Sequence, residues 1–142
     1  MSKTLILTVW LPRSGKTTWS HQQETPVVNP DAMRLAIYNS AFVLEAETLV
    51  WTHVEYMLKA LFLAGHEKVI LDATNITEEK RYKWRQFAAK IWVWIKFKCF
   101  HTDLHECKER AKKCWTEYLI PVIDRMARDI NYPEEWEMIV NV

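Results

Sequence analysis

The chain has 142 residues with a formal net charge of +1, and 49% of its residues are hydrophobic and 26% charged. These values are those of one ordinary globular domain over residues 1–142, and they exclude a global basic field that attracts nucleic acid. No apolar run approaches the roughly 18 residues of a membrane span, no signal peptide is evident, and three cysteines cannot all pair. A cytoplasmic protein without a membrane partner is therefore expected.

Two residue counts are unusual. The chain holds 2 glycines and 8 tryptophans, although glycine makes up about 7% of an average sequence. Glycine is the residue on which left-handed turns and phosphate-binding loops depend. The sequence is therefore unusual by descent or has been redesigned, and composition alone leaves both explanations open.

Strands and helices alternate along the predicted chain. The first strand is an apolar run over 5–11, which is typical of a strand buried in a parallel sheet. Asp31 is predicted to cap a helix over 31–39, and Gly65 to end a long helix over 43–64. The buried stripe of that long helix is predicted at Val50, Val54, Met57, Leu58, Leu61 and Phe62. The remaining strands are predicted at 26–29, 68–72, 92–100 and 136–142, and the remaining helices at 16–23, 77–90, 104–113 and 121–130.

This alternation predicts an α/β fold with a mostly parallel central sheet flanked by helices. The strand over 92–100 alternates apolar and polar residues, which places it near the edge of the sheet. Ligands bind at the carboxyl ends of parallel strands. Three polar groups, at 14–17, 29–34 and 72–75, each follow a predicted strand. We expect them to meet at one edge of the sheet, called here the carboxyl edge.

The first of these groups contains the sequence Ser14-Gly15-Lys16-Thr17, which matches the second half of the phosphate-binding motif G-x-x-x-x-G-K-[ST]. In such a loop the backbone N–H groups cradle phosphates, the lysine reaches the β- and γ-phosphates, and the Thr17 hydroxyl binds Mg²⁺. The motif's first glycine is replaced by Trp10. We expect ATP to bind the loop residues Arg13, Ser14, Gly15, Lys16, Thr17 and Thr18, and a chance match to the motif is the alternative.

The second group contains two candidate catalytic residues. Asp31 is a candidate general base for a hydroxyl acceptor, and capping its helix is the alternative or additional role. Arg34 lies one helical turn later on the same face, where its planar guanidinium suits an acceptor phosphate. A local salt bridge between Asp31 and Arg34 is the alternative for the arginine.

The third group and a basic helix complete the candidate site. Asp72 ends an apolar strand, and its carboxylate is a candidate Mg²⁺ ligand, either directly or through water. The basic segment over 104–119 is a candidate lid that folds over the phosphates and neutralises charge in the transition state. A solvated helix face is the alternative for this segment.

The chain resembles the kinase domain of bacteriophage-type polynucleotide 5′-hydroxyl kinases, within the broader P-loop phosphotransferases. The resemblance spans nearly the whole chain. It rests on L-P-R-S-G-K-T-T-W at 11–19, N-P-D-A-M-R at 29–34, V-I-L-D-A-T-N at 69–75, F-H-T-D-L-H-E-C-K-E-R at 100–110, I-P-V-I-D-R-M at 120–126 and Y-P-E-E-W at 132–136.

The resemblance implies a three-layer P-loop kinase fold and ATP-dependent phosphorylation of a 5′-hydroxyl DNA or RNA end. It implies a base role for Asp31, acceptor-phosphate binding by Arg34, and support of Mg²⁺ by Asp72. Arg110 matches the first lid arginine of the family. The second lid arginine falls at Cys114, which leaves Lys113 as the nearest cation, and a lysine does not reproduce a bidentate guanidinium contact.

Large aromatic residues stand at Trp10 and Trp115, where the family has glycine or commonly places it. Our hypothesis is a redesigned or heavily diverged member whose fold survives and whose activity is weak or absent. Two other interpretations stay open at this point: a small-molecule or toxin-type P-loop kinase, and an α/β scaffold that binds little or no nucleotide. The sequence leaves the oligomeric state open.

Overall fold

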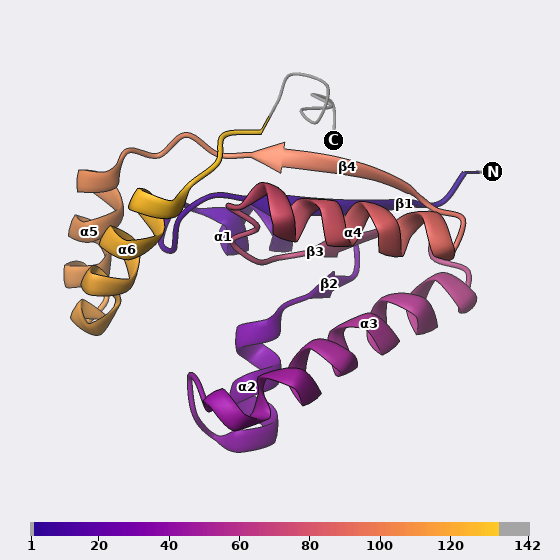
Figure 1. Ribbon diagram of the computed structural model, residues 1–142, viewed down its shortest axis with the longest axis horizontal. Helices are drawn as coiled ribbons and strands as arrows, with labels where there is room; N and C mark the ends of the chain where they lie inside the picture. Colours follow the sequence, from indigo (N-terminus) through magenta and orange to yellow (C-terminus); the bar gives the residue numbers. More distant parts are fainter. Residues whose placement is uncertain (1, 134–142) are drawn as a thin grey trace.

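Four parallel strands form the central sheet of the protein, in a computed structural model that describes residues 2–133 (Figure 1). The strands are β1 (Thr4–Val9), β2 (Val27–Val28), β3 (Lys68–Leu71) and β4 (Trp94–Cys99). The helices are α1 (Lys16–His21), α2 (Pro30–Tyr38), α3 (Glu47–Leu63), α4 (Glu78–Lys90), α5 (Leu104–Lys113) and α6 (Ile120–Asp129), with short 3-10 helices at η1 (Leu44–Ala46) and η2 (Glu117–Leu119). The strand predicted at 136–142 lies outside the described residues.

The strand order is β2-β3-β1-β4, so β1 lies inside the sheet between two parallel neighbours. Leu5 pairs with Val69 of β3 on one side and with Ile95 of β4 on the other. This arrangement confirms the predicted α/β fold with its parallel sheet flanked by helices. β4 is the last strand of the described sheet, as its alternating sequence predicted.

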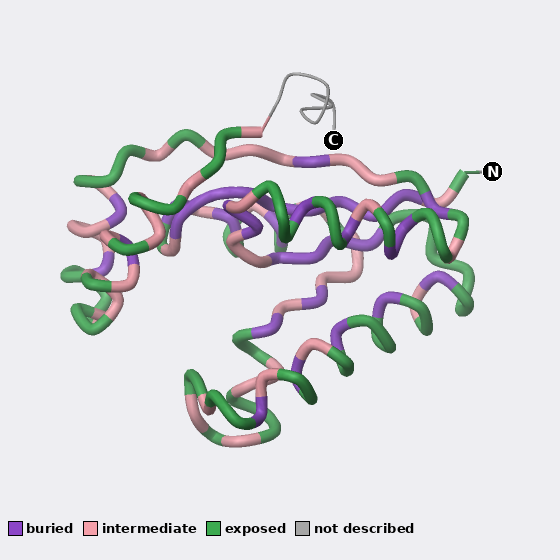
Figure 2. The backbone as a smooth tube through the Cα atoms, in the orientation of Figure 1, coloured by how far each residue is buried: buried purple, intermediate pink, exposed green. Residues whose placement is uncertain are grey.

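The strand β1 in the interior of the sheet is covered on both faces. Successive side chains of a strand point to opposite faces, and every residue of β1 is buried. One face of the sheet packs against the apolar sides of α3 and α4 in a single large core cluster. Figure 2 shows the buried segments concentrated along the strands and on one side of α3. Two covered faces explain why the sequence of β1 is apolar almost throughout.

The long predicted helix is divided into η1 and α3. Four of the predicted core positions of α3 are buried: Val50, Val54, Leu58 and Phe62. Met57, also predicted to be buried, is exposed, because a position one residue before Leu58 is turned about 100° away from the packed face. No helix among the described residues is long and apolar enough to cross a membrane.

A second, smaller core lies at the other end of the molecule, where α5 and α6 lie side by side (Figure 1). Its buried members are Trp10, Leu11, Cys107, Ala111 and Ile123, and we call this group the α5–α6 cluster. Lys108 of α5 also forms an ion pair with Asp124 of α6. The cluster therefore joins the residues that follow β1 to the candidate lid.

After each of three helices, the second residue beyond the end of the helix has a left-handed backbone conformation. These residues are Gly65 after α3, Trp92 after α4 and Trp115 after α5, with φ angles of 104°, 59° and 57°. In each case the following N–H bonds back to a carbonyl in the last turn: His66 to Leu61, Val93 to Ala88 and Thr116 to Ala111. Trp92 therefore ends a helix and does not begin the predicted strand at 92–100. Glycine is the residue that this conformation favours, yet two of the three positions hold tryptophan.

Candidate active site

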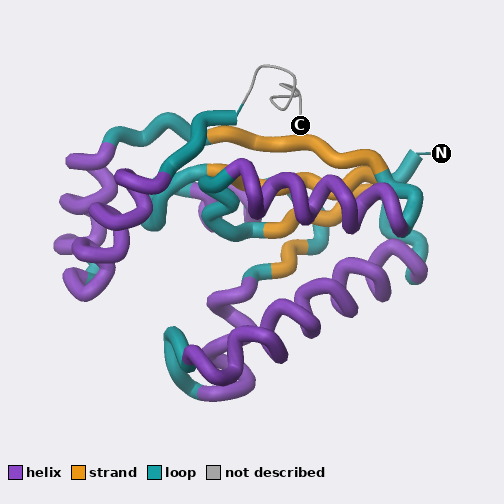
Figure 3. The backbone as a smooth tube through the Cα atoms, viewed as in Figure 1, coloured by secondary structure: helices purple, strands orange, loops and turns teal. Residues whose placement is uncertain are grey.

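The loops that follow β1, β2 and β3 meet at the carboxyl edge of the sheet, as the sequence predicted (Figure 3). These loops carry the Ser14–Thr17 segment, the start of α2 and Asp72. Side-chain hydrogen bonds join all three of them, as described below. The predicted convergence is therefore confirmed for these groups.

The loop after β1 has carbonyl groups that are bonded and N–H groups that are not. The carbonyl of Arg13 accepts a hydrogen bond from Nη1 of Arg110 at 3.3 Å, and the carbonyl of Ser14 accepts one from Oγ1 of Thr102 at 2.8 Å. Residues 13–18 donate no backbone hydrogen bond to any residue within 2–133. Gly15 has a φ of 101°, which other residues rarely adopt. The loop thus presents a run of unused backbone donors, as an anion site needs.

Lys16 is buried beneath this loop. Its Nζ donates to the carbonyl oxygen of Leu11 at 2.6 Å and to Oγ of Ser14 at 3.3 Å. Burial lowers the pKa of Lys16 from 10.5 to about 8, although the nearby Asp72 carboxylate opposes this shift. The ammonium group is therefore held at the loop by the carbonyl of Leu11 and the hydroxyl of Ser14.

Asp72 links the three loops. Its Oδ2 accepts hydrogen bonds from Oγ1 of Thr17 at 2.7 Å and from Nδ2 of Asn29 at 3.2 Å. Its Oδ1 accepts one from Oγ1 of Thr8 at 3.3 Å. The side chain of Thr17 is thus directed at Asp72 although the residue itself is exposed. This buried carboxylate fixes the loop over residues 13–18, called here the phosphate loop, relative to the start of α2.

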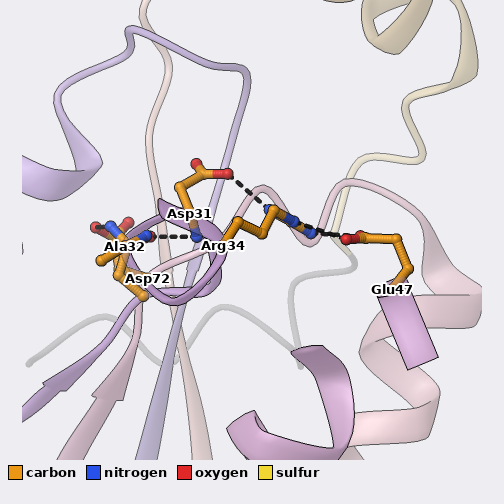
Figure 4. A network of polar contacts seen from close by, with 6 residues as sticks. Asp31, Ala32, Arg34, Glu47 and Asp72 are labelled. Carbon is orange, nitrogen blue, oxygen red and sulfur yellow. Dashed lines mark hydrogen bonds and ion pairs between the residues drawn. The ribbon is translucent and has the colours of Figure 1, made fainter. Parts of the chain in front are cut away.

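Asn29, and not Asp31, caps α2. Its Oδ1 accepts hydrogen bonds from the backbone N–H groups of Asp31 at 2.8 Å and Ala32 at 3.3 Å (Figure 4). Pro30 occupies the first turn of the helix, where its missing N–H costs nothing, and this places the cap one residue before it. The predicted capping role of Asp31 is therefore wrong, and its carboxylate is free of that task.

Asp31 and Arg34 contact each other, with Oδ1 of the aspartate 2.7 Å from Nη1 of the arginine (Figure 4). Arg34 also bonds Glu47 at the start of α3, through Nε at 2.9 Å and Nη2 at 2.6 Å. The local salt bridge that the sequence left as an alternative is present. Burial alone lowers the pKa of Arg34, but the hydrogen bonds with Glu47 and the charge of Asp31 raise it above its ordinary value.

The candidate lid contacts the phosphate loop through Arg110. Besides bonding the carbonyl of Arg13, its Nη1 lies 3.8 Å from the position that a Cβ on Gly15 would occupy. Nε of Arg110 also bonds Oε1 of Glu106 at 3.0 Å, one turn earlier on α5. Lys113 is exposed at the end of α5, and its ammonium group makes no hydrogen bond or ion pair within the described residues. The structure brings Arg110 to the loop and leaves Lys113 in solvent.

Trp10 turns its indole away from the phosphate loop and into the α5–α6 cluster. It is 7% exposed, and its Nε1 donates to the carbonyl oxygen of Thr102 at 2.5 Å. Its ring lies 6.0 Å from that of His101 and 5.6 Å from that of Tyr132, between ring centroids. The residue that replaces the first motif glycine therefore acts as a core residue, and its backbone is not left-handed.

Three residues of this site were not singled out from the sequence. Thr8 lies in β1 and donates a hydrogen bond to Asp72. Thr102 lies after β4 and donates one to the carbonyl of Ser14 in the loop after β1. Glu47 binds Arg34 from 13 residues away. A threonine inside the apolar run over 5–11 is a weak signal for the first of these, whereas the other two depend on tertiary contacts.

The sequence model of the family described as AAA domain matches residues 5–114, which is most of the chain. The chain belongs to the AAA domain family. The match includes the phosphate loop, the start of α2, Asp72 and all of α5. A search of the curated proteins found no match.

Solved structures of P-loop kinases share the fold of this AAA domain. A chain of the Pnkp1/Rnl/Hen1 RNA repair complex is 22% identical with a TM-score of 0.69. This match covers 92% of this chain and 47% of that chain. A second structure of the Pnkp1/Rnl/Hen1 complex is 27% identical with a TM-score of 0.68, covering 77% of this chain and 39% of that chain. The AAA domain thus spans about half the length of the repair-complex chain it matches, or less.

The APS kinase CysC of Mycobacterium tuberculosis, solved with AMPPNP and APS, is 16% identical with a TM-score of 0.64. This match covers 94% of this chain and 85% of that chain. The AAA domain therefore has a P-loop kinase fold, which it shares with the APS kinase over most of both chains.

Proposed function

We propose that the protein transfers the γ-phosphate of ATP to the 5′-hydroxyl end of a polynucleotide. The observation that carries the proposal is the Thr17–Asp72 hydrogen bond beside a loop whose backbone donors are unused. A hydroxyl, a carboxylate and free N–H groups at the end of a parallel strand are the groups that a nucleoside triphosphate and its metal ion require.

The oxygen atoms present fit Mg²⁺. Mg²⁺ binds oxygen ligands such as hydroxyl and carboxylate groups. Oγ1 of Thr17 and Oδ2 of Asp72 lie 2.7 Å apart, so these two groups would hold the ion, with Asp72 binding it directly or through water. No group of three or more aspartate, glutamate, histidine or cysteine residues that could hold a metal ion by itself is found within residues 2–133. Bound Mg²⁺ would neutralise charge on the β- and γ-phosphates.

The chain's own residues supply the remaining chemistry. Lys16 and the N–H groups of residues 13–18 hold the triphosphate, and Arg110 approaches its outer end from the lid. The side chain of Asp31 is 81% exposed, so an incoming 5′-hydroxyl can reach its carboxylate and give up its proton as its oxygen attacks the γ-phosphorus. The bond from the γ-phosphorus to the β–γ bridging oxygen breaks, and ADP leaves with that oxygen. Arg34, bonded to Asp31, binds the phosphate next to that hydroxyl.

A polynucleotide acceptor is supported by the 27% identity to a chain of the Pnkp1/Rnl/Hen1 complex and by the sequence resemblance to polynucleotide kinases. A small-molecule acceptor is the second candidate. A small-molecule acceptor is favoured by the lengths of the matched chains. The match covers 85% of the APS kinase chain but only 47% of the repair-complex chain.

The test is transfer of labelled phosphate from ATP to a 5′-hydroxyl oligonucleotide. We expect the wild-type protein to label the oligonucleotide and Asp31→Asn to reduce the rate by about 100-fold or more, the loss typical of a general base. Glu45→Ala removes an exposed carboxylate from η1, outside the site, and serves as the matched control. Labelling of small hydroxyl compounds alone would favour the second candidate. Unchanged transfer in Asp31→Asn would exclude Asp31 as the base.

A further inference from the structure

The guanidinium of Arg34 is held by two carboxylates of very different exposure. The side chains of Arg34 and Glu47 are 12% and 18% exposed, whereas the side chain of Asp31 is 81% exposed. Glu47 bonds the guanidinium bidentately through Nε and Nη2, and Asp31 bonds only Nη1. Glu47 is therefore the inner partner and Asp31 the outer one.

The donor count of the arginine leaves room for a ligand. A guanidinium has five N–H donors in a fixed plane. Glu47 takes two of them and Asp31 takes one. The remaining two belong to Nη1 and Nη2. A phosphate oxygen can accept from these donors without displacing Glu47.

An aromatic ring lies against the same guanidinium. Cζ of Arg34 lies 5.8 Å from the ring centroid of Trp51, which is one helical turn after Glu47 on α3. The ring of Trp51 packs against that of Trp84 on α4, 6.1 Å away, and Trp84 belongs to the main core. Glu47 and Trp51, in the first two turns of α3, thus hold Arg34 from a helix that packs against the main core.

The charge of Glu47 suits this task. The hydrogen bond from Arg34 lowers the pKa of the Glu47 carboxyl, so that the group stays ionised. Its negative charge offsets that of Arg34, which weakens the long-range attraction of the arginine for a phosphate. Glu47 therefore raises the affinity of Arg34 for the acceptor phosphate through orientation, because a fixed guanidinium loses less conformational freedom when a ligand binds.

We propose that Glu47 is a positioning residue that orients Arg34 toward the phosphate of the acceptor. This inference rests on the proposed transfer to a polynucleotide end. It assigns Glu47 no contact with the reacting atoms and no role in nucleotide binding. A structural role alone predicts a loss of stability with unchanged acceptor recognition, whereas a positioning role changes recognition of the acceptor specifically.

The test is the steady-state kinetics of the transfer to a 5′-hydroxyl oligonucleotide. We expect Glu47→Ala to raise KM for the oligonucleotide by about tenfold or more and to leave KM for ATP unchanged. Glu47→Gln keeps one acceptor oxygen and should give an intermediate KM, which protects the test if the alanine variant fails to fold. Glu45→Ala, two residues away and exposed, should behave as the wild type.

A double-mutant cycle shows whether Glu47 acts through Arg34. If it does, Glu47→Ala causes no further rise in KM when Arg34 is already alanine. Additive effects of the two substitutions, or an unchanged or lower acceptor KM in Glu47→Ala and Glu47→Gln, would overturn the inference while leaving the transfer activity intact. A wild-type protein that does not label the oligonucleotide would instead overturn the proposed function itself.

Discussion

Oγ1 of Thr17 donates a hydrogen bond of 2.7 Å to Oδ2 of Asp72, which joins the first turn of α1 to the end of β3. The two residues are 55 positions apart in the sequence, and each follows a strand of the same parallel sheet. This one contact places a hydroxyl and a carboxylate where the sequence predicts a metal ion. It also couples the candidate metal site to the stability of the fold.

Replacing Asp72 is expected to affect both stability and nucleotide binding. Asp72 is 4% exposed, and its carboxylate accepts hydrogen bonds from Thr8, Thr17 and Asn29. Asp72→Ala removes the acceptor of Thr17 and Asn29, whereas Thr8 keeps the carbonyl of Ala73 at 3.0 Å. The substitution should lower the free energy of unfolding by about 1–3 kcal/mol, measured by urea denaturation. In calorimetry, Mg²⁺ should strengthen ATP binding to the wild type and not to the variant. An equal effect of Mg²⁺ on both proteins would contradict the role of Asp72 at the metal.

The depressed pKa of Lys16 predicts how nucleotide binding depends on pH. The free protein holds Lys16 with a pKa of about 8, and bound phosphate favours the charged ammonium. Above pH 8, ATP binding must therefore be accompanied by proton uptake, and the Kd for ATP should rise with pH. Calorimetry in buffers of different ionisation enthalpy measures this uptake. Proton uptake that is equal at pH 7 and pH 9 would be inconsistent with a buried Lys16 of lowered pKa.

The same pKa makes a prediction about stability. Because the folded pKa of Lys16 lies below its ordinary value of 10.5, the unfolded chain binds more protons than the folded one between pH 8 and 10.5. The contribution of Lys16 to the free energy of unfolding should therefore rise with pH across this window. Urea denaturation of the wild type and Lys16→Met at pH 7.5 and pH 10 measures it. The difference in stability between the two proteins should shift in favour of the wild type at the higher pH.

Two tryptophans should be replaceable by glycine with a gain in stability. Trp92 and Trp115 are left-handed and are 93% and 84% exposed, so that they are strained and bury little surface. Trp92→Gly and Trp115→Gly should each raise the free energy of unfolding by about 1 kcal/mol. Gly65→Ala, at the equivalent position after α3, should lower it by a similar amount. Destabilisation by both tryptophan substitutions would show that the indoles contribute packing energy outweighing the backbone strain.

Trp10 should respond in the opposite way. Trp10→Gly restores the motif's first glycine but removes a buried indole from the α5–α6 cluster, and it should lower the free energy of unfolding by about 3–5 kcal/mol. Trp10→Phe keeps most of the packing and should bind ATP as the wild type does. ATP binding that is stronger in Trp10→Phe by about tenfold or more would indicate that the indole obstructs the loop.

The features predicted correctly from the sequence are those with a local signal. The apolar run of β1 and the Gly15-Lys16-Thr17 sequence each carry their own pattern, and the alternation of strands and helices brings Asp72 to the same edge. The cap of α2 was misassigned although Pro30 is a local signal, since proline favours the first helical position and leaves the residue before it as the cap. Pro30 at the start of the helix therefore identifies Asn29 as the cap of α2.

Other features depend on contacts that no local pattern records. The direction of the Trp10 side chain is set by the packing of α5 and α6, about 100 residues later in the chain. The pairing of Arg34 with Glu47 depends on how α3 folds back beside α2. The strained tryptophans at 92 and 115 contradict local preference, so a sequence pattern predicts a glycine there and not the residue found.

We propose that the loop over residues 13–18 is an intact phosphate cradle despite Trp10. The decisive measurement is isothermal titration with ATP and Mg²⁺. We predict saturable 1:1 binding to the wild type that is lost in Lys16→Ala and kept in Lys68→Ala, which removes an exposed lysine at the start of β3. A wild-type protein that binds no nucleotide, or one whose binding is unchanged in Lys16→Ala, would contradict the account.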